Sequence, residues 1–193
     1  MTFAGKTDLL ILREALEPEG IGPEIIRERL GDWQSHFVDL TLRLGSETPL
    51  FVSCSGVESV LAELDRDDRF LLSILTGNLE PMAAVKLAAV GVDAHFRLRG
   101  AYGGDHEDRN ALPAIAAARI AEQTGRDFAP ERYVIVGDTP RDVEAARAFG
   151  MRCVAVATGH FSVDALAACG PDAVLPDLCT FESVLALIHN GFS

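Results

Sequence analysis

One segment constrains the fold more than any other part of the chain, and it spans residues 134–142. Its short apolar run predicts a buried strand. Thr139 followed by Pro140 predicts a helix N-cap with proline at the first helical position. Asp138 then lies at the carboxyl end of a strand, which is where open α/β sheets bind their ligands. The segment therefore predicts a strand–turn–helix unit that carries an acid at a ligand-binding position.

From about residue 70 onward, the chain alternates between predicted strands and predicted helices. The strands are expected at 70–75, 95–98, 133–136, 154–157 and 173–175, and the helices at 82–90, 110–124, 140–149, 163–168 and 181–189. Strands joined by helices of this length require right-handed crossovers and a parallel sheet. We therefore predict an α/β fold with a doubly wound parallel sheet over residues 49–193.

Residues 1–48 follow a different pattern, because no strand is expected in them. Residues 7–17 and 24–44 are predicted to be helical, with a turn-rich break between them and an interruption at Gly31-Asp32. This region is expected to form a small helical subdomain. Residues 45–49 are expected to link it to the α/β part, where residues 56–64 form a helix that packs on the sheet.

Composition excludes several classes of function. The formal net charge of -12 disfavours a nucleic-acid partner, although a local basic pocket could still bind a small anion. No apolar run is long enough to cross a membrane, and the first residues carry no signal sequence. The four cysteines lack Cys-x-x-Cys spacing, so we expect reduced thiols in a cytoplasmic protein.

Three separate positions could carry chemistry, and each also has a purely structural explanation. Thr76, Gly77 and Asn78 follow an apolar run, where a hydroxyl and backbone N–H groups can bind phosphate, but they also suit an ordinary turn. Arg109 precedes a helix and could hold a phosphate with two donors, or be a solvated surface arginine.

The third position is the acidic pair Asp138 and Asp142. Their hard oxygen ligands suit Mg²⁺, but carboxylates at a helix N-terminus also simply favour the helix dipole. The functional reading gains weight from the strand before the pair and the proline after it.

In their order and spacing, these motifs together resemble the haloacid dehalogenase (HAD) superfamily, and in particular its phosphoglycolate-phosphatase-like branch. The stretch from Gly5 to Asp8 resembles the start of that branch's helical cap, so the resemblance covers nearly the whole chain. It implies a Rossmann-like core at 49–193, part of a cap at 1–48, and Mg²⁺-dependent hydrolysis of small phosphorylated metabolites through an aspartyl-phosphate.

The resemblance also implies a role for each matching residue. Thr76 would bind the transferring phosphoryl group, together with Gly77 and Asn78, and Arg109 would neutralise its charge where the family usually has lysine. Asp138 would be the Mg²⁺ ligand, and Asp142 would orient the basic residue or reach the metal through water. Lys6 and Asp8 at the cap entrance would contact the substrate.

One departure from the family is large. Its members begin with an apolar strand leading into Asp-x-Asp-x-Thr, whose first aspartate is the nucleophile, and no such motif follows an apolar strand here. The acidic stretches at 65–68 and 105–108 are better explained as solvated loops than as substitutes. We therefore expect the chain as given to begin inside the cap and to be inactive, because the nucleophile is absent. The preferred explanation is that the start codon, or the boundary of the given sequence, is placed too late.

That departure has a structural consequence. The absent strand would be central, between the strands that end at Thr76 and Asp138, so its loss exposes two rows of backbone hydrogen-bonding groups. A chain of this kind should be marginally stable, incomplete or a homo-oligomer. Two alternatives to a truncated enzyme remain: a non-catalytic binding or regulatory module, and one half of a split enzyme whose other chain supplies the strand.

Overall fold

Parallel strands form the centre of the molecule in the computed structural model, which describes residues 3–46 and 48–179. The first sheet pairs β1 (Ser73–Leu75) with β2 (Leu98–Ala101). The second sheet has the order β3 (Val134–Gly137), β4 (Arg152–Val156), β5 (Ala173–Leu175). Both pairings in the second sheet are parallel, as is the pairing in the first. The predicted parallel α/β architecture is confirmed.

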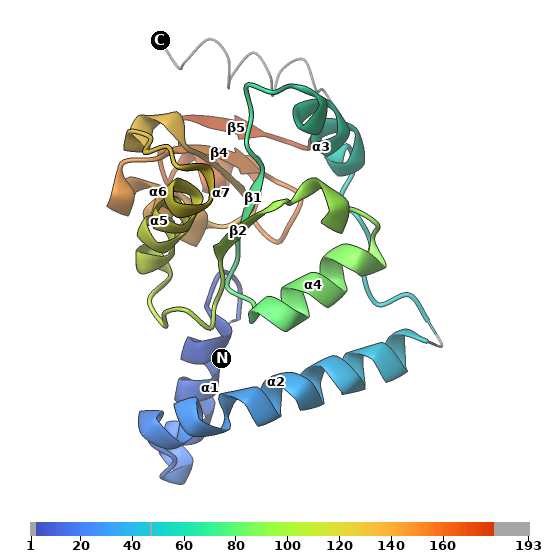
Figure 1. Cartoon of the computed structure of the whole chain (residues 1–193), viewed down its shortest axis with the longest axis vertical. Helices are drawn as coiled ribbons and strands as arrows, with labels where there is room; N and C mark the ends of the chain where they lie inside the picture. The colour runs from blue at the N-terminus through green and yellow to red at the C-terminus, as the bar shows by residue number, and fades with distance from the viewer. Residues whose placement is uncertain (1–2, 47, 180–193) are drawn as a thin grey trace.

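Helices connect these strands and also form the amino-terminal part. They are α1 (Asp8–Leu16), α2 (Pro23–Gly45), α3 (Val57–Arg66), α4 (Glu80–Ala89), α5 (Leu112–Thr124), α6 (Pro140–Phe149) and α7 (Val163–Ala167). Short 3₁₀ turns are η1 (Glu17–Glu19), η2 (Asp93–His95), η3 (Arg109–Ala111) and η4 (Pro130–Arg132). Figure 1 shows α1 and α2 at one end of the molecule, with α2 running beside α4.

Three details differ from the sequence predictions. Helix α2 continues through Gly31 and Asp32, where an interruption was expected, because one glycine costs a helix only about 1 kcal/mol and neighbouring contacts offset it. Asp32 pairs with Arg29 one turn earlier. The strand expected at 95–98 is instead η2 followed by β2, and β1 is shorter than the apolar run that predicts it. The helix expected at 181–189 lies outside the described residues.

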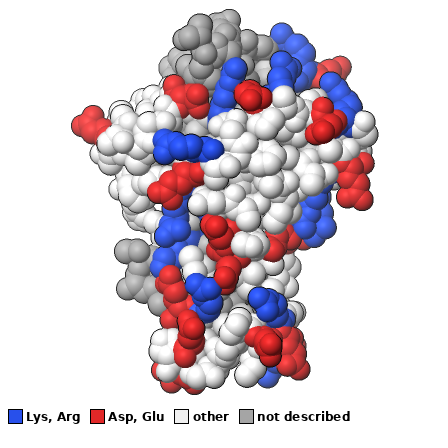
Figure 2. Space-filling view, turned by 90° about the vertical axis from the view of Figure 1, so that its left-hand side faces the viewer, with Lys and Arg blue, Asp and Glu red and all other residues white. Residues whose placement is uncertain are grey.

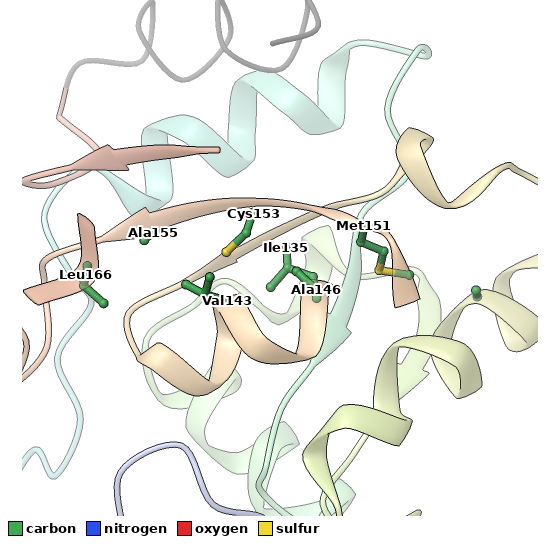
Figure 3. Packing of buried hydrophobic residues seen from close by; sticks show 8 residues of the cluster. Ile135, Val143, Ala146, Met151, Cys153, Ala155 and Leu166 are labelled. Carbon is green, nitrogen blue, oxygen red and sulfur yellow. The ribbon is translucent and has the colours of Figure 1, made fainter. Parts of the chain in front are cut away.

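The main hydrophobic core lies where α6 packs on β3 and β4 (Figure 3). Its buried members are Ala117, Ile135, Val143, Ala146, Met151, Cys153, Ala155 and Leu166. Alternate residues of β3 point to opposite faces of the sheet, so Ile135 is 8% exposed while the next residue, Val136, is 46% exposed. This packing fixes the orientation of β3 and therefore of the turn that follows it.

The two sheets are not joined to each other by strand pairing among the described residues. β1 and β3 are both parallel strands, yet neither pairs with the other, and only side chains such as Leu75 connect them to a common core. The amino-terminal segment closes the space at the carboxyl ends of the strands. A Cβ atom on Gly5 would be 2.8 Å from Thr139 Oγ1, and Asp8 donates its backbone N–H to Gly77 O at 2.7 Å.

Charged side chains of both signs are interspersed on the face shown in Figure 2. Among the described residues, ion pairs within one helix join Arg43 with Asp39 in α2 and Arg66 with Glu63 in α3. Within residues 3–46 and 48–179, no helix has the length and apolar character that a membrane crossing demands.

Candidate functional site

The turn between β3 and α6 forms as the sequence predicts. Thr139 is the N-cap of α6 and Pro140 its first residue, and Asp142 folds back so that its Oδ2 accepts from Thr139 N at 2.9 Å and from Thr139 Oγ1 at 2.7 Å. A Cβ atom on Gly137 would lie 2.3 Å from Asp142 Cγ, so this turn requires glycine there. Asp142 is only 4% exposed, and its carboxylate is thus part of the helix cap.

Arg109 reaches this cap from a different part of the chain. Its Nη2 donates to Asp142 Oδ1, and the side chains of the pair are 11% and 6% exposed. Its Nη1 makes a longer bond of 3.4 Å to Gly5 O. The Nε–H of Arg109 is buried and has no hydrogen-bond partner among the described residues. A buried guanidinium with one vacant donor is suited to receive an acceptor oxygen from a ligand.

The loop after β1 completes this group. Thr76 donates its backbone N–H to Ala101 O at 3.0 Å, which fixes the loop to β2, and its Oγ1 accepts from Asn78 N at 3.2 Å. A Cβ atom on Gly77 would be 3.1 Å from Arg109 Nη1, so the guanidinium packs against the backbone of this loop. Three predicted site segments, separated by up to 66 residues (Thr76 to Asp142), thus meet at the carboxyl ends of the strands.

Asp138 lies at the end of β3 beside Asp142, and it is partly buried. Its pKa is raised, first by burial and then by the charge of Asp142, while Arg109 and His160 act in the opposite direction. Its Oδ2 would be 2.0 Å from a Cβ atom on Gly159, in the turn after β4. Sequence reasoning missed Gly159 and His160. Their position in the sequence could have indicated them, because they follow the strand β4, which is parallel to β3 and ends at the same edge of the sheet.

Lys6 and Asp8 are close to the loop after β1 but are held by protein partners. Lys6 Nζ pairs with Glu14 of α1. Asp8 Oδ2 accepts from Leu79 N at 2.8 Å, and its Oδ1 from the Asn78 amide at 3.4 Å. Asp8 therefore anchors the start of α4, and its role as a substrate contact remains a prediction.

The two acidic stretches are more ordered than expected. In the first, Asp65 Oδ2 lies 3.2 Å from His95 Nδ1 and 3.1 Å from Arg97 Nη2. In the second, Asp105 forms a bidentate pair with Arg119, so the expectation of a fully solvated loop was wrong for that residue. In the described parts of the chain, no group of three or more His, Cys, Asp or Glu residues could hold a metal ion.

A cleft of about 290 Å³ opens beside Asn78 and Leu79, between α2 and α4. Its walls combine apolar side chains with a few polar ones. They are Asp8, Gln34, Phe37, Thr41, Phe51, Asn78, Leu79, Met82 and Lys86. Lys86 Nζ donates to Asn78 Oδ1 at 2.8 Å and lies over the Phe51 ring, so the cleft has a cation at its edge nearest the loop after β1.

Comparison with known proteins finds related sequences and folds. The family model described as HAD-hydrolase-like matches residues 109–181. A phosphoglycolate phosphatase of Cupriavidus necator is 28% identical over 185 residues, which is 95% of this chain and 75% of that protein. The tyrosine-protein kinase PtkA of Mycobacterium tuberculosis is 28% identical over 153 residues, 79% of this chain and 48% of that one.

Among solved structures, a hydrolase from Pseudomonas syringae superposes with a TM-score of 0.64 at 19% identity, covering 93% of this chain and 90% of that one. This likeness shows a shared fold. The chain is therefore similar to HAD-like hydrolases over residues 109–181 and to phosphoglycolate phosphatases over most of its length. It spans three quarters of the C. necator relative and about half of PtkA.

Proposed function

We propose that this chain carries the phosphate- and metal-binding half of a phosphomonoester hydrolase site for small phosphorylated metabolites. The observation that carries the proposal is the position of Arg109, which packs against Gly77, pairs with Asp142 and keeps a buried Nε–H without a partner. A phosphate oxygen would supply the missing acceptor. The hydroxyl proton of Thr76 and the backbone N–H of Gly77 would complete an electrostatic cradle for the phosphoryl group.

Mg²⁺ fits this site through Asp138 rather than through both acids. Mg²⁺ keeps several waters and needs only one or two protein carboxylates besides a substrate phosphate. Asp138 is half-buried with a raised pKa, and a nearby cation would favour its charged form. The Asp142 carboxylate is already engaged by Arg109 and Thr139. When bound, Mg²⁺ would shield the phosphoryl oxygens, while Asp142 would hold Arg109 in place.

Hydrolysis through an aspartyl-phosphate also requires a carboxylate nucleophile. In residues 3–46 and 48–179, the acids nearest the cradle are Asp8, Asp138 and Asp142, and each has one of the tasks above. We therefore propose that these residues bind phosphate and metal and that turnover needs an aspartate from an additional segment.

The separation of β1 from β3 favours one alternative in particular, a split or extended enzyme. Val136 is 46% exposed in the middle of β3, and β1 and β3 both lack a strand partner on their facing sides among the described residues. An additional extended segment, from this polypeptide or another, could pair with both strands. A non-catalytic binding module is the remaining alternative, and the same edges would then stay unpaired.

Binding and turnover should be measured separately. We expect tungstate, as a phosphate mimic, to bind the chain in isothermal titration calorimetry, and Thr76→Val to weaken it by about tenfold because one charge-assisted hydrogen bond is lost. Thr48→Ala, at an exposed site between α2 and α3, is the control. Absence of tungstate binding, or equal binding by Thr76→Val, would refute the proposed cradle.

The catalytic part is tested with p-nitrophenyl phosphate and Mg²⁺. The 193-residue chain should show no turnover, and a version extended by the codons upstream of Met1 should show it if those codons encode the additional strand. Turnover by the 193-residue chain itself would contradict the proposal that an additional segment supplies the nucleophile.

A further inference from the structure

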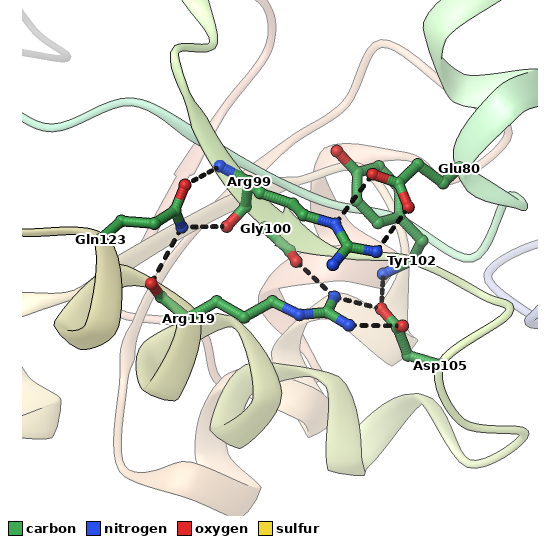
Figure 4. A network of polar contacts seen from close by, with 7 residues as sticks. All are labelled: Glu80, Arg99, Gly100, Tyr102, Asp105, Arg119 and Gln123. Carbon is green, nitrogen blue, oxygen red and sulfur yellow. Dashed lines mark hydrogen bonds and ion pairs between the residues drawn. The ribbon is translucent and has the colours of Figure 1, made fainter.

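A partly buried ion pair holds the loop that precedes Arg109. Arg119 in α5 donates from Nη1 and Nη2 to the two carboxylate oxygens of Asp105, at 2.6 and 2.7 Å, and from Nη1 to Gly100 O at 2.7 Å (Figure 4). Asp105 Oδ2 also accepts from Tyr102 N at 2.8 Å. The pair therefore ties the end of β2, the start of the loop and the middle of α5 together.

The same loop packs directly on residues 76–78, the phosphate loop of the proposed cradle. Gly103 donates its N–H to Asn78 O at 2.8 Å, and a Cβ atom on Gly103 would be only 1.7 Å from Gly77 O. On its other side, Glu107 O accepts from Thr7 Oγ1 at 2.6 Å. Residues 102–108 thus contact the phosphate loop and the amino-terminal segment, and Arg109 follows immediately.

The electrostatics of the pair show that it is charged and well satisfied. Burial alone would raise the pKa of Asp105, but the hydrogen bonds from Arg119 and from Tyr102 N outweigh burial and lower it. The side chains of Arg119 and Asp105 are 22% and 18% exposed. A second bidentate pair in Figure 4, Arg99 with Glu80, is more exposed and connects β2 to α4. Its charges act on Tyr102 and Asp105, but its side-chain hydrogen bonds are within the pair.

We infer that Asp105 and Arg119 are positioning residues for Arg109. They hold residues 102–108 against the phosphate loop, so that the guanidinium of Arg109 and the N–H of Gly77 face one phosphoryl group together. This inference rests on the proposed phosphate cradle and adds its positioning device. A rigid fork between Arg119 and Asp105 suits this task, because small displacements of a charge-binding group weaken binding strongly.

The test is a double-mutant cycle on tungstate affinity, measured by calorimetry. Asp105→Asn keeps the side-chain shape but loses the charge, and we expect it to weaken tungstate binding about fivefold or more in the native background. In an Arg109→Lys background, which keeps a positive charge beside Asp142 but removes the guanidinium, the same change should have a much smaller effect, because there is no guanidinium left to position. Glu80→Gln, which breaks the neighbouring pair, should leave affinity unchanged.

The outcomes separate the inference from the proposed function. Equal weakening by Asp105→Asn in both backgrounds, or a change below twofold, would overturn the inference while leaving the cradle intact. If the native chain binds no tungstate, the cradle itself fails and the inference with it. If Asp105→Asn does not fold, Arg119→Lys is used in its place, because lysine keeps the positive charge but lacks the two-pronged guanidinium. The same cycle and the same criteria then apply.

Discussion

Arg109 and Asp142 form a buried ion pair between two β–α units that strand pairing does not connect. Asp142 belongs to the N-terminus of α6 after β3, and Arg109 to η3 after β2, yet their side chains are 6% and 11% exposed. The pair therefore links the two half-sheets at the end where the candidate site lies. It also explains why Asp142 is a partner for Arg109 rather than a free ligand.

Removal of Arg109 should destabilise the protein because it leaves the charge of Asp142 buried. We expect Arg109→Ala to reduce the free energy of unfolding by about 3 kcal/mol or more, measured by urea denaturation. The control is Arg66→Ala, which breaks an exposed pair with Glu63 and should cost less than about 1 kcal/mol. Similar costs for the two variants would show that the Arg109–Asp142 pair contributes no special stability.

Gly159 should control metal binding through Asp138. A methyl group at this position would meet Asp138 Oδ2 at 2.0 Å, so Gly159→Ala should rotate the carboxylate away and weaken Mg²⁺ binding about tenfold without unfolding the chain. Gly31→Ala is the control, because a Cβ atom there meets nothing within 4 Å. Calorimetric Mg²⁺ titrations measure both, and unchanged affinity in Gly159→Ala would exclude Asp138 as the ligand.

Asp138 should also give stability a distinct pH dependence. Burial and Asp142 raise its pKa above the unfolded value of about 4, so this group favours the folded state at low pH, and its contribution is lost as pH rises through the folded pKa. Asp138→Asn should therefore raise the urea midpoint at pH 7 and reduce its difference from the midpoint near the unfolded pKa, at about pH 4. Asp68→Asn, at an exposed site, should do neither, and a lower midpoint for Asp138→Asn at pH 7 would contradict this assignment.

Neighbouring residues of β3 should respond very differently to truncation. Ile135 packs in the core, whereas Val136 is half-exposed on the opposite face. We expect Ile135→Ala to cost about 3 kcal/mol and Val136→Ala less than about 1 kcal/mol, measured by thermal and urea unfolding. A large cost for Val136→Ala would mean that this face is covered in solution, as pairing with an additional strand would produce.

The local features of the site were readable from the sequence because they depend on short-range chemistry. Thr139, Pro140 and Gly150 specify the beginning and end of α6, and the structure has α6 at Pro140–Phe149. The alternation of apolar runs and helices similarly specified a parallel α/β fold. Helix α2, in contrast, continues through Gly31 because its packing and ion pairs override one weak helix former.

Only the tertiary structure decided which side chains act on one another. The family resemblance left two roles open for Asp142, orienting the basic residue or reaching the metal through water, and the structure shows its contact with Arg109, 33 residues earlier. The tertiary structure likewise shows that Asp105 pairs with Arg119 and that Asp138 packs against Gly159. Such contacts join residues on separate strands and helices, and local propensity carries no information about which strand ends meet.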